Sequence, residues 1–123
     1  MILKPIVRPL PNKNLYELVT AFHTIIDGIE VDIPEGFIFD GASVPRFLWS
    51  IIGSPYLPQY IGAGLVHDYL YRTGIVSRKK ADQIFYDLLR DNKVSKFYAR
   101  KMYWGVRFGG WKAWNKHRKN DTK

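Results

Sequence analysis

The sequence predicts an α+β domain, with a small antiparallel sheet near the N-terminus and three helices after it. The first half of the chain is rich in β-forming residues and carries the turn dipeptide Asp27-Gly28. From Pro58 onward, apolar residues recur at the three-and-four-residue spacing of helices. A chain of 123 residues with 46% hydrophobic content buries one core, so we expect a single domain over residues 1–115 and a basic tail over 116–123.

The predicted sheet is built around a hairpin. Residues 15–26 favour strand, Asp27-Gly28 supplies a tight type I′ turn, and residues 29–33 alternate apolar with acidic side chains. Residues 34–36 form a second predicted turn, which leads into a short strand over 37–39. The chain then turns again from Asp40, and Pro45 begins a short predicted helix that reaches Trp49.

Three longer helices are predicted after Pro58. The first covers residues 60–71 and is stopped by Gly74, and Ser77 then caps the second. The buried face of the second helix is predicted to hold Ala81, Ile84, Phe85, Leu88 and Leu89. Ser95 caps the third helix, which runs towards Gly109-Gly110. This pair of glycines either ends the helix or lets it pack closely, and the sequence leaves both readings open.

The first two helices carry residues suited to acid–base chemistry. His67 and Tyr71 lie four residues apart on one face of the first, and Asp82 borders the apolar stripe of the second. The short connection over residues 72–76 favours antiparallel packing, which brings His67 next to Asp82 and the Tyr71 hydroxyl to the same carboxylate. In this arrangement His67 can be a general base held by the Asp82 carboxylate, provided that the second ring nitrogen of His67 is open to solvent.

A second interpretation of these residues stays open. His67, Tyr71 and Asp82 would then form a satisfied polar network that fixes the register of the helices and performs no chemistry. Metal-dependent phosphohydrolases and zinc sites need more ligands than the sequence offers, because only His23 and His117 remain and the chain has no Cys. The lack of Cys also suits a reducing cytoplasm.

The motif His67-Asp68-x-x-Tyr71, followed by Ala81-Asp82-x-x-Phe85, resembles the core of the phospholipase A2 superfamily, particularly its parvoviral and microbial branches. The resemblance implies that His67 is the general base for a water molecule, with Asp82 orienting it and Tyr71 bonded to Asp82. It also implies Ca²⁺ as cofactor, with Asp68 as a ligand. No Gly-rich calcium loop precedes His67 at the usual place, and the turn that begins at Asp40 is the nearest substitute, so Asp40 is a second candidate ligand.

A longer stretch resembles the domain of unknown function 1353 family, which occurs mainly in tailed bacteriophages and prophages. The matching segments are 39–46, Leu48-Trp49, 67–71, Ser77-Arg78 and Ala81-Asp82. This resemblance implies a phage protein made in the host cytoplasm. It implies no activity of its own. The phospholipase A2-like motif suggests a hydrolase of lipid or envelope ester bonds, and the alternative is a non-enzymatic tail or tail-tip component of the virion.

The C-terminal fifth of the chain is basic and aromatic. From Arg100 onward, eight Lys and Arg residues stand against Asp121 alone, which gives this part a net charge of +7. Such a segment can dock on other virion proteins, on bacterial envelope lipid or on nucleic acid. The residues predicted to bind a partner are Arg107, Trp111, Lys112, Trp114, Lys116 and Arg118. No stretch has the roughly 20 apolar residues of a transmembrane helix.

Overall fold

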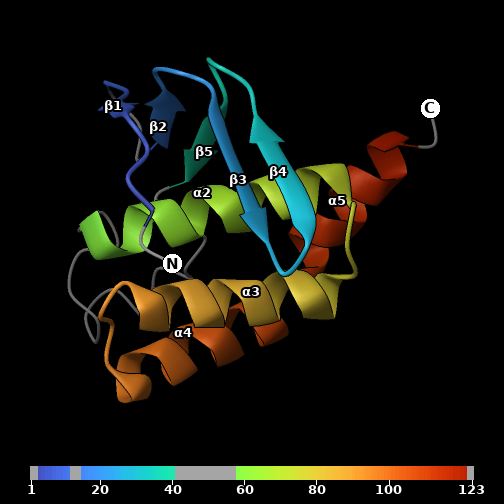
Figure 1. The fold of residues 1–123 in the computed structure, drawn as a ribbon. Helices are drawn as coiled ribbons and strands as arrows, with labels where there is room; N and C mark the ends of the chain where they lie inside the picture. The colour runs from blue at the N-terminus through green and yellow to red at the C-terminus, as the bar shows by residue number, and fades with distance from the viewer. Residues whose placement is uncertain (1–2, 12–14, 41–57, 122–123) are drawn as a thin grey trace.

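The structure, a computed structural model, describes residues 3–11, 15–40 and 58–121. Small antiparallel sheets and then helices occupy these residues, which confirms the predicted α+β class (Figure 1). The strands are β1 (Val7–Pro9), β2 (Leu15–Leu18), β3 (Phe22–Ile26), β4 (Ile29–Ile33) and β5 (Ile38–Asp40). The helices are α2 (Pro58–Thr73), α3 (Arg78–Asp91), α4 (Lys96–Gly109) and α5 (Trp111–Asp121). The short helix predicted after Pro45 lies outside the described residues.

The hairpin of β3 and β4 forms at the predicted turn. Ile26 pairs with Ile29, and the two residues between them, Asp27 and Gly28, have φ of 51° and 78°. A type I′ turn requires positive φ at both central residues, and Asp-Gly tolerates it. The carboxylate of Asp27 also accepts a 2.8 Å hydrogen bond from the Lys80 ammonium, which ties the hairpin tip to the start of α3.

The strand predicted over residues 15–26 is in fact two strands that belong to different sheets. β2 pairs antiparallel with β1 on one side and β5 on the other, whereas β3 pairs only with β4 among the described strands. Hydrophobic pattern did not reveal this division, because both halves are β-forming and the chain changes sheet within a few residues. β1 was not predicted at all. It ends at Pro9 and lies at the edge of the sheet, where a proline is tolerated.

Two predicted caps are present in the helical half. The Ser77 hydroxyl accepts from the Lys80 backbone N–H at the start of α3, and Ser95 does the same for Tyr98 at the start of α4. Gly74 follows α2 with φ of 64°, and its N–H donates to Leu70.

Four helices rather than three follow the strands in the described residues. The predicted third helix ends at Gly109, and Gly110 caps it before α5 begins. Residues 116–121, expected to be a tail, therefore continue a helix that contacts both α2 and α4.

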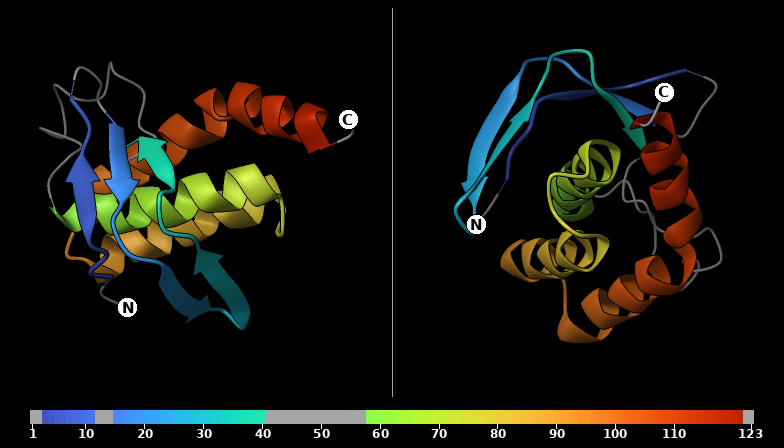
Figure 2. Two further views of the ribbon diagram at one scale, coloured as in Figure 1. Left: turned by 90° about the horizontal axis from the view of Figure 1, so that it is seen from above. Right: turned by 90° about the vertical axis from the view of Figure 1, so that its right-hand side faces the viewer.

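Helix α2 is the centre of the domain. Figure 2 shows the strands arching over one side of it, while α3, α4 and α5 surround the other. Accordingly, α2 contacts α3, α5 and β5, and its residues Ala63, Leu65, Val66 and Leu70 are fully buried. No helix in the described part of the chain is long and apolar enough to cross a membrane.

Candidate active site

The structure brings His67 and Asp82 together, as the short connection between their helices predicted. α2 and α3 run antiparallel (Figure 1), and His67 Nε2 lies 2.7 Å from Asp82 Oδ1. Both side chains are buried, with exposed fractions of 2% and 0%. A carboxylate can only accept a hydrogen bond, so Nε2 carries the hydrogen and the lone pair of a neutral ring is on Nδ1.

Tyr71 is the second donor to the same carboxylate oxygen. It lies one helical turn after His67, and its hydroxyl donates to Asp82 Oδ1 at 2.7 Å. The two rings from α2 also contact each other, with centroids 4.3 Å apart. Burial, and then the hydrogen bond to Asp82, raise the pKa of Tyr71, so this hydroxyl keeps its proton and stays a donor.

The other oxygen of Asp82 faces two guanidinium groups. Arg107 on α4 donates to Oδ2 at 2.8 Å, and Arg78 on α3 lies 3.6 Å from it. Burial alone raises the pKa of Asp82, but the hydrogen bonds from His67, Tyr71 and Arg107 outweigh it and hold the pKa below 3.8. Asp82 is therefore an ionised carboxylate at the meeting point of three helices.

Arg78 links this carboxylate to the end of α4. Its guanidinium donates to the carbonyl of Val106 at 3.2 Å and to that of Arg107 at 2.9 Å. These carbonyls belong to the last turn of α4, where a cation is favoured, and the Val106 carbonyl also accepts the backbone N–H of Gly110. Arg78 thus caps α4 and approaches Asp82.

The junction of α4 and α5 closes against Tyr71. A side chain added at Gly110 would come within 3.1 Å of Tyr71 Cε2 and closer still to its hydroxyl. The Trp114 ring meets the Tyr71 ring edge-on, with centroids 5.3 Å apart. Gly110 therefore both caps α4 and permits close packing, and it does so at the candidate site.

The second ring nitrogen of His67, Nδ1, was expected to be open to solvent, but the structure buries it. Nδ1 is buried and has no hydrogen-bond partner among the described residues. The Phe85 ring packs on the imidazole, with centroids 4.7 Å apart. A buried acceptor without a partner costs about 1–3 kcal/mol, so the network around Asp82 is complete on the carboxylate side and incomplete on the imidazole side.

The described residues do not form a calcium site around Asp68. Its carboxylate lies 3.3 Å from the Arg72 guanidinium, which also donates to the Ile38 carbonyl. The positive charge beside Asp68 is therefore the Arg72 guanidinium. In the described part of the chain, no three or more His, Cys, Asp or Glu side chains form a group that could hold a metal ion. Ca²⁺ usually takes 6–8 oxygens, which these residues do not supply. The Asp40 side chain lies outside the description, and calcium binding stays a prediction.

The residues predicted to bind a partner divide into two groups. Arg107, Trp114 and Arg118 turn inward: Arg107 bonds to Asp82, and Arg118 lies over the Trp114 ring and donates to the Arg72 carbonyl. By contrast, Trp111, Lys112 and Lys116 are exposed.

Sequence reasoning missed the two arginines of the site. Arg78 had a detectable signal, because it precedes Asp82 by four residues on the same helix and therefore shares its face. Arg107 had no such signal, since its approach to Asp82 depends on how α4 packs against α3.

This arrangement defines an α+β domain with a buried His–Asp–Tyr–Arg network between its helices. The chain belongs to the family described as Protein of unknown function (DUF1353), whose model matches residues 16–106. It is 38% identical over 95 residues to the uncharacterized protein y4jT of Sinorhizobium fredii, and 31% identical over 67 residues to y4iH of the same organism.

These alignments cover 76% and 54% of this chain but only 28% of each relative, so the chain spans little more than a quarter of the curated relatives it matches. No solved structure matches the chain significantly. The family match ends at Val106, just before Arg107 and α5.

Proposed function

We propose that this domain is a hydrolase in which His67 is the general base. The observation that carries the proposal is the asymmetry of its imidazole, with Nε2 bonded to Asp82 and Nδ1 buried without a partner among the described residues. Asp82 holds the ring in the tautomer whose Nδ1 can take a proton from water. Water bound at Nδ1 would also relieve the cost of the unpaired acceptor.

The substrate class in this proposal is a carboxylic ester, including those of lipids. The resemblance of the two-helix motif to phospholipases A2 supports it, and the contacts of His67, Tyr71 and Asp82 agree with the roles that the resemblance implies. An oxyanion donor near Gly41 would lie outside the described residues. No step is assigned to Ca²⁺, because the described residues around Asp68 do not fit it.

Burial of Nδ1 sets a condition on the proposal. His67 is only 2% exposed, so ester and water reach it only when the side chains around it move apart. The same burial favours a second candidate function, in which the network is a brace between α2, α3 and α4 and the domain is a binding module. The phage setting, the virion role and the host-cytoplasmic location implied by family resemblance stay predictions.

A glutamine at position 67 separates the two functions. In His67→Gln, the side-chain amide keeps a donor for Asp82 but removes the nitrogen base, whereas His67→Ala removes both. General-base catalysis predicts that His67→Gln loses about 10²–10⁴-fold of the ester hydrolysis rate and unfolds close to wild type in urea. The rate is measured with p-nitrophenyl esters and as fatty-acid release from phospholipid vesicles.

The brace predicts a different pattern from the same proteins. Wild type and His67→Gln would then show equal hydrolysis on both substrates, while His67→Ala would be less stable than either. Equal rates in wild type and His67→Gln would therefore overturn the hydrolase proposal, whatever the stability of the alanine variant.

A further inference from the structure

Helix α4 has a second apolar face that the core does not use. Its inner face buries Ala99, Met102 and Val106, as an amphipathic helix should. On the opposite side, Phe97, Trp104 and Phe108 are 61%, 54% and 76% exposed. These residues recur at helical spacing, so they form one stripe along the helix. We call this stripe, together with the half-exposed Trp111 at the start of α5, the outer aromatic stripe.

The aromatic rings of the stripe contact one another and nearby lysines. The rings of Trp104 and Phe108 stack with centroids 5.8 Å apart, and Lys101 places its ammonium 4.7 Å from the Phe97 ring centre. Lys112 lies 5.6 Å from the Trp111 ring centre in the same way. Each cation thus sits beside an aromatic ring, as lysines do at a boundary between apolar and polar surroundings.

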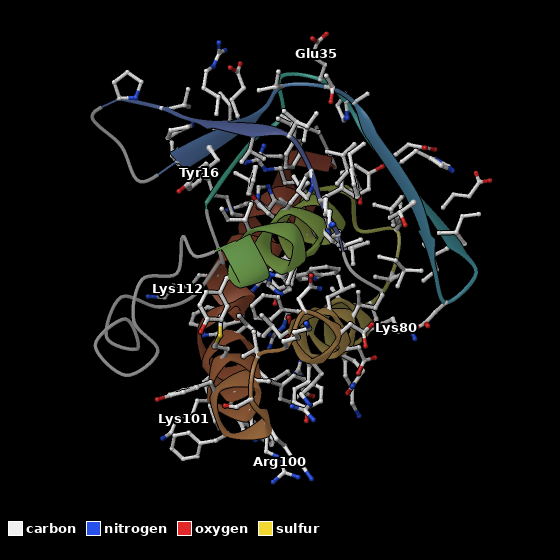
Figure 3. The ribbon with its side chains drawn as sticks, turned by 60° about the vertical axis from the view of Figure 1, so that its left-hand side comes forward. Tyr16, Glu35, Lys80, Arg100, Lys101 and Lys112 are labelled. Carbon is white, nitrogen blue, oxygen red and sulfur yellow. The ribbon has the colours of Figure 1, made fainter. Side chains whose placement is uncertain are left out.

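The segment that carries the stripe has charges of only one sign. Between Lys96 and Asn120 the sequence has eight Lys and Arg residues and no Asp or Glu. Arg107 and Arg118 are engaged inside the domain, but Arg100, Lys101 and Lys112 extend outward (Figure 3). Arg100 and Lys101 project from α4 on the side away from the strands (Figure 3).

We infer that the outer aromatic stripe docks the domain onto an anionic lipid surface. Aromatic side chains on one helix face with Lys and Arg beside them are the combination that seats a helix in the plane of a membrane interface. The rings enter the boundary between headgroups and acyl chains, and the cations bind anionic headgroups. Charge complementarity selects this occupant, because a second copy of the chain would bring the same unbalanced positive charge to the interface.

The inference does not depend on hydrolysis by His67. Among the described residues, no side chain of the stripe makes a hydrogen bond or a ring contact with His67, Tyr71 or Asp82, so docking can be measured without catalysis. If both proposals hold, the stripe brings the site to lipid esters. If the hydrolase proposal fails, docking on its own gives the binding module a ligand.

The test is sedimentation of the whole chain with vesicles of phosphatidylcholine alone or mixed with phosphatidylglycerol. Wild type should bind the mixed vesicles, weaken as salt rises, and shift its tryptophan emission to shorter wavelength on binding. Trp104→Ser with Phe108→Ser should bind at least about tenfold more weakly, since each buried aromatic contributes roughly that factor. His67→Gln should bind as wild type does.

Matched variants control for apolarity and for net charge. Ile25→Ser removes a half-exposed apolar residue from β3 on the other side of the domain, and should leave binding unchanged. Arg100→Gln with Lys101→Gln should weaken binding by roughly fivefold for each cation. Lys4→Gln with Lys79→Gln, at two exposed lysines outside α4 and α5, lowers the net charge equally, and should weaken binding less.

Three results would overturn the inference. The first is equal affinity for the neutral and the anionic vesicles. The second is unchanged binding by the Trp104→Ser, Phe108→Ser protein. The third is another occupant of the stripe in the absence of vesicle binding: a dimer in sedimentation velocity that these substitutions dissolve, or a labelled single-stranded oligonucleotide that they release.

Discussion

Each face of α4 carries side chains that packing of the core alone does not explain. The inner side sends the charged Arg107 to a fully buried carboxylate, while the outer side exposes Phe97, Trp104 and Phe108 to solvent. Burying a charge costs free energy unless it is paired, and exposing large aromatics forgoes the stabilisation that burial gives. Neither the buried charge nor the exposed aromatic residues maximise the stability of a small domain.

Each face of α4 therefore has a role besides packing the core. On the inner side, Asp82 of α3 is stabilised by donors from α2 and α4, and it in turn fixes the imidazole of His67. On the outer side, the exposed aromatic residues contact one another, nearby lysines and the adjacent rings of Tyr98 and Tyr103. Substitutions on the inner side should therefore change folding, and substitutions on the outer side should change binding.

The largest effect on stability is expected for Asp82→Ala. It leaves Nε2 of His67, the Tyr71 hydroxyl and the Arg107 guanidinium without their shared acceptor. Removing one partner of a buried charged network costs about 3–5 kcal/mol of unfolding free energy. Urea unfolding followed by circular dichroism measures this loss, and a loss under about 1 kcal/mol would show that the carboxylate is not the joint between the helices.

Asp82→Asn is the matched control, because it keeps an acceptor for His67 and Tyr71 but cannot ionise. The folded pKa of Asp82 is below the ordinary 3.8, so its ionised form adds stability above that pH, which is lost as the pH falls towards the folded value. Wild type should thus lose stability on acidification below about pH 4 more steeply than Asp82→Asn. Equal slopes would contradict the lowered pKa.

Local sequence pattern was sufficient for the His67–Asp82 pair and insufficient for its arginine partner. Helical spacing fixes which face His67 and Tyr71 share, and the short loop after Gly74 determines where Asp82 lies. Both constraints act between residues that are close together in the sequence. Arg107 reaches the same carboxylate from α4, and its position depends on the angle at which α4 packs, which no spacing encodes.

The strands show the same limit. Asp27-Gly28 predicted the hairpin because the turn conformation depends on those two residues alone. The pairing of β2 with both β1 and β5 is a long-range choice, and one continuous β-forming run over residues 15–26 cannot show where the chain changes sheet.

A moderate effect is expected for Gly110→Ala, where the inner side of α4 ends. The new Cβ would lie 2.5 Å from the Val106 carbonyl oxygen and against Tyr71, so one of them must shift. Overpacking of this kind costs about 1–3 kcal/mol. A double-mutant cycle with Tyr71→Phe measures the contact, because loss of the hydroxyl should recover part of the cost. Purely additive effects in the cycle would exclude it.

The smallest effect on stability is expected on the outer side, for Phe108→Ser. Its ring is 76% exposed, and its stacking on Trp104 leaves both rings largely in water, so the unfolding free energy should change by no more than about 0.5 kcal/mol. Met102→Ala on the inner side of the same helix removes a fully buried side chain and should cost about 2–5 kcal/mol. Comparable losses in these two proteins would mean that the outer aromatic stripe belongs to the core. A difference of several kcal/mol, together with weaker vesicle binding by the variants of the outer side, would assign the exposed aromatics to docking alone.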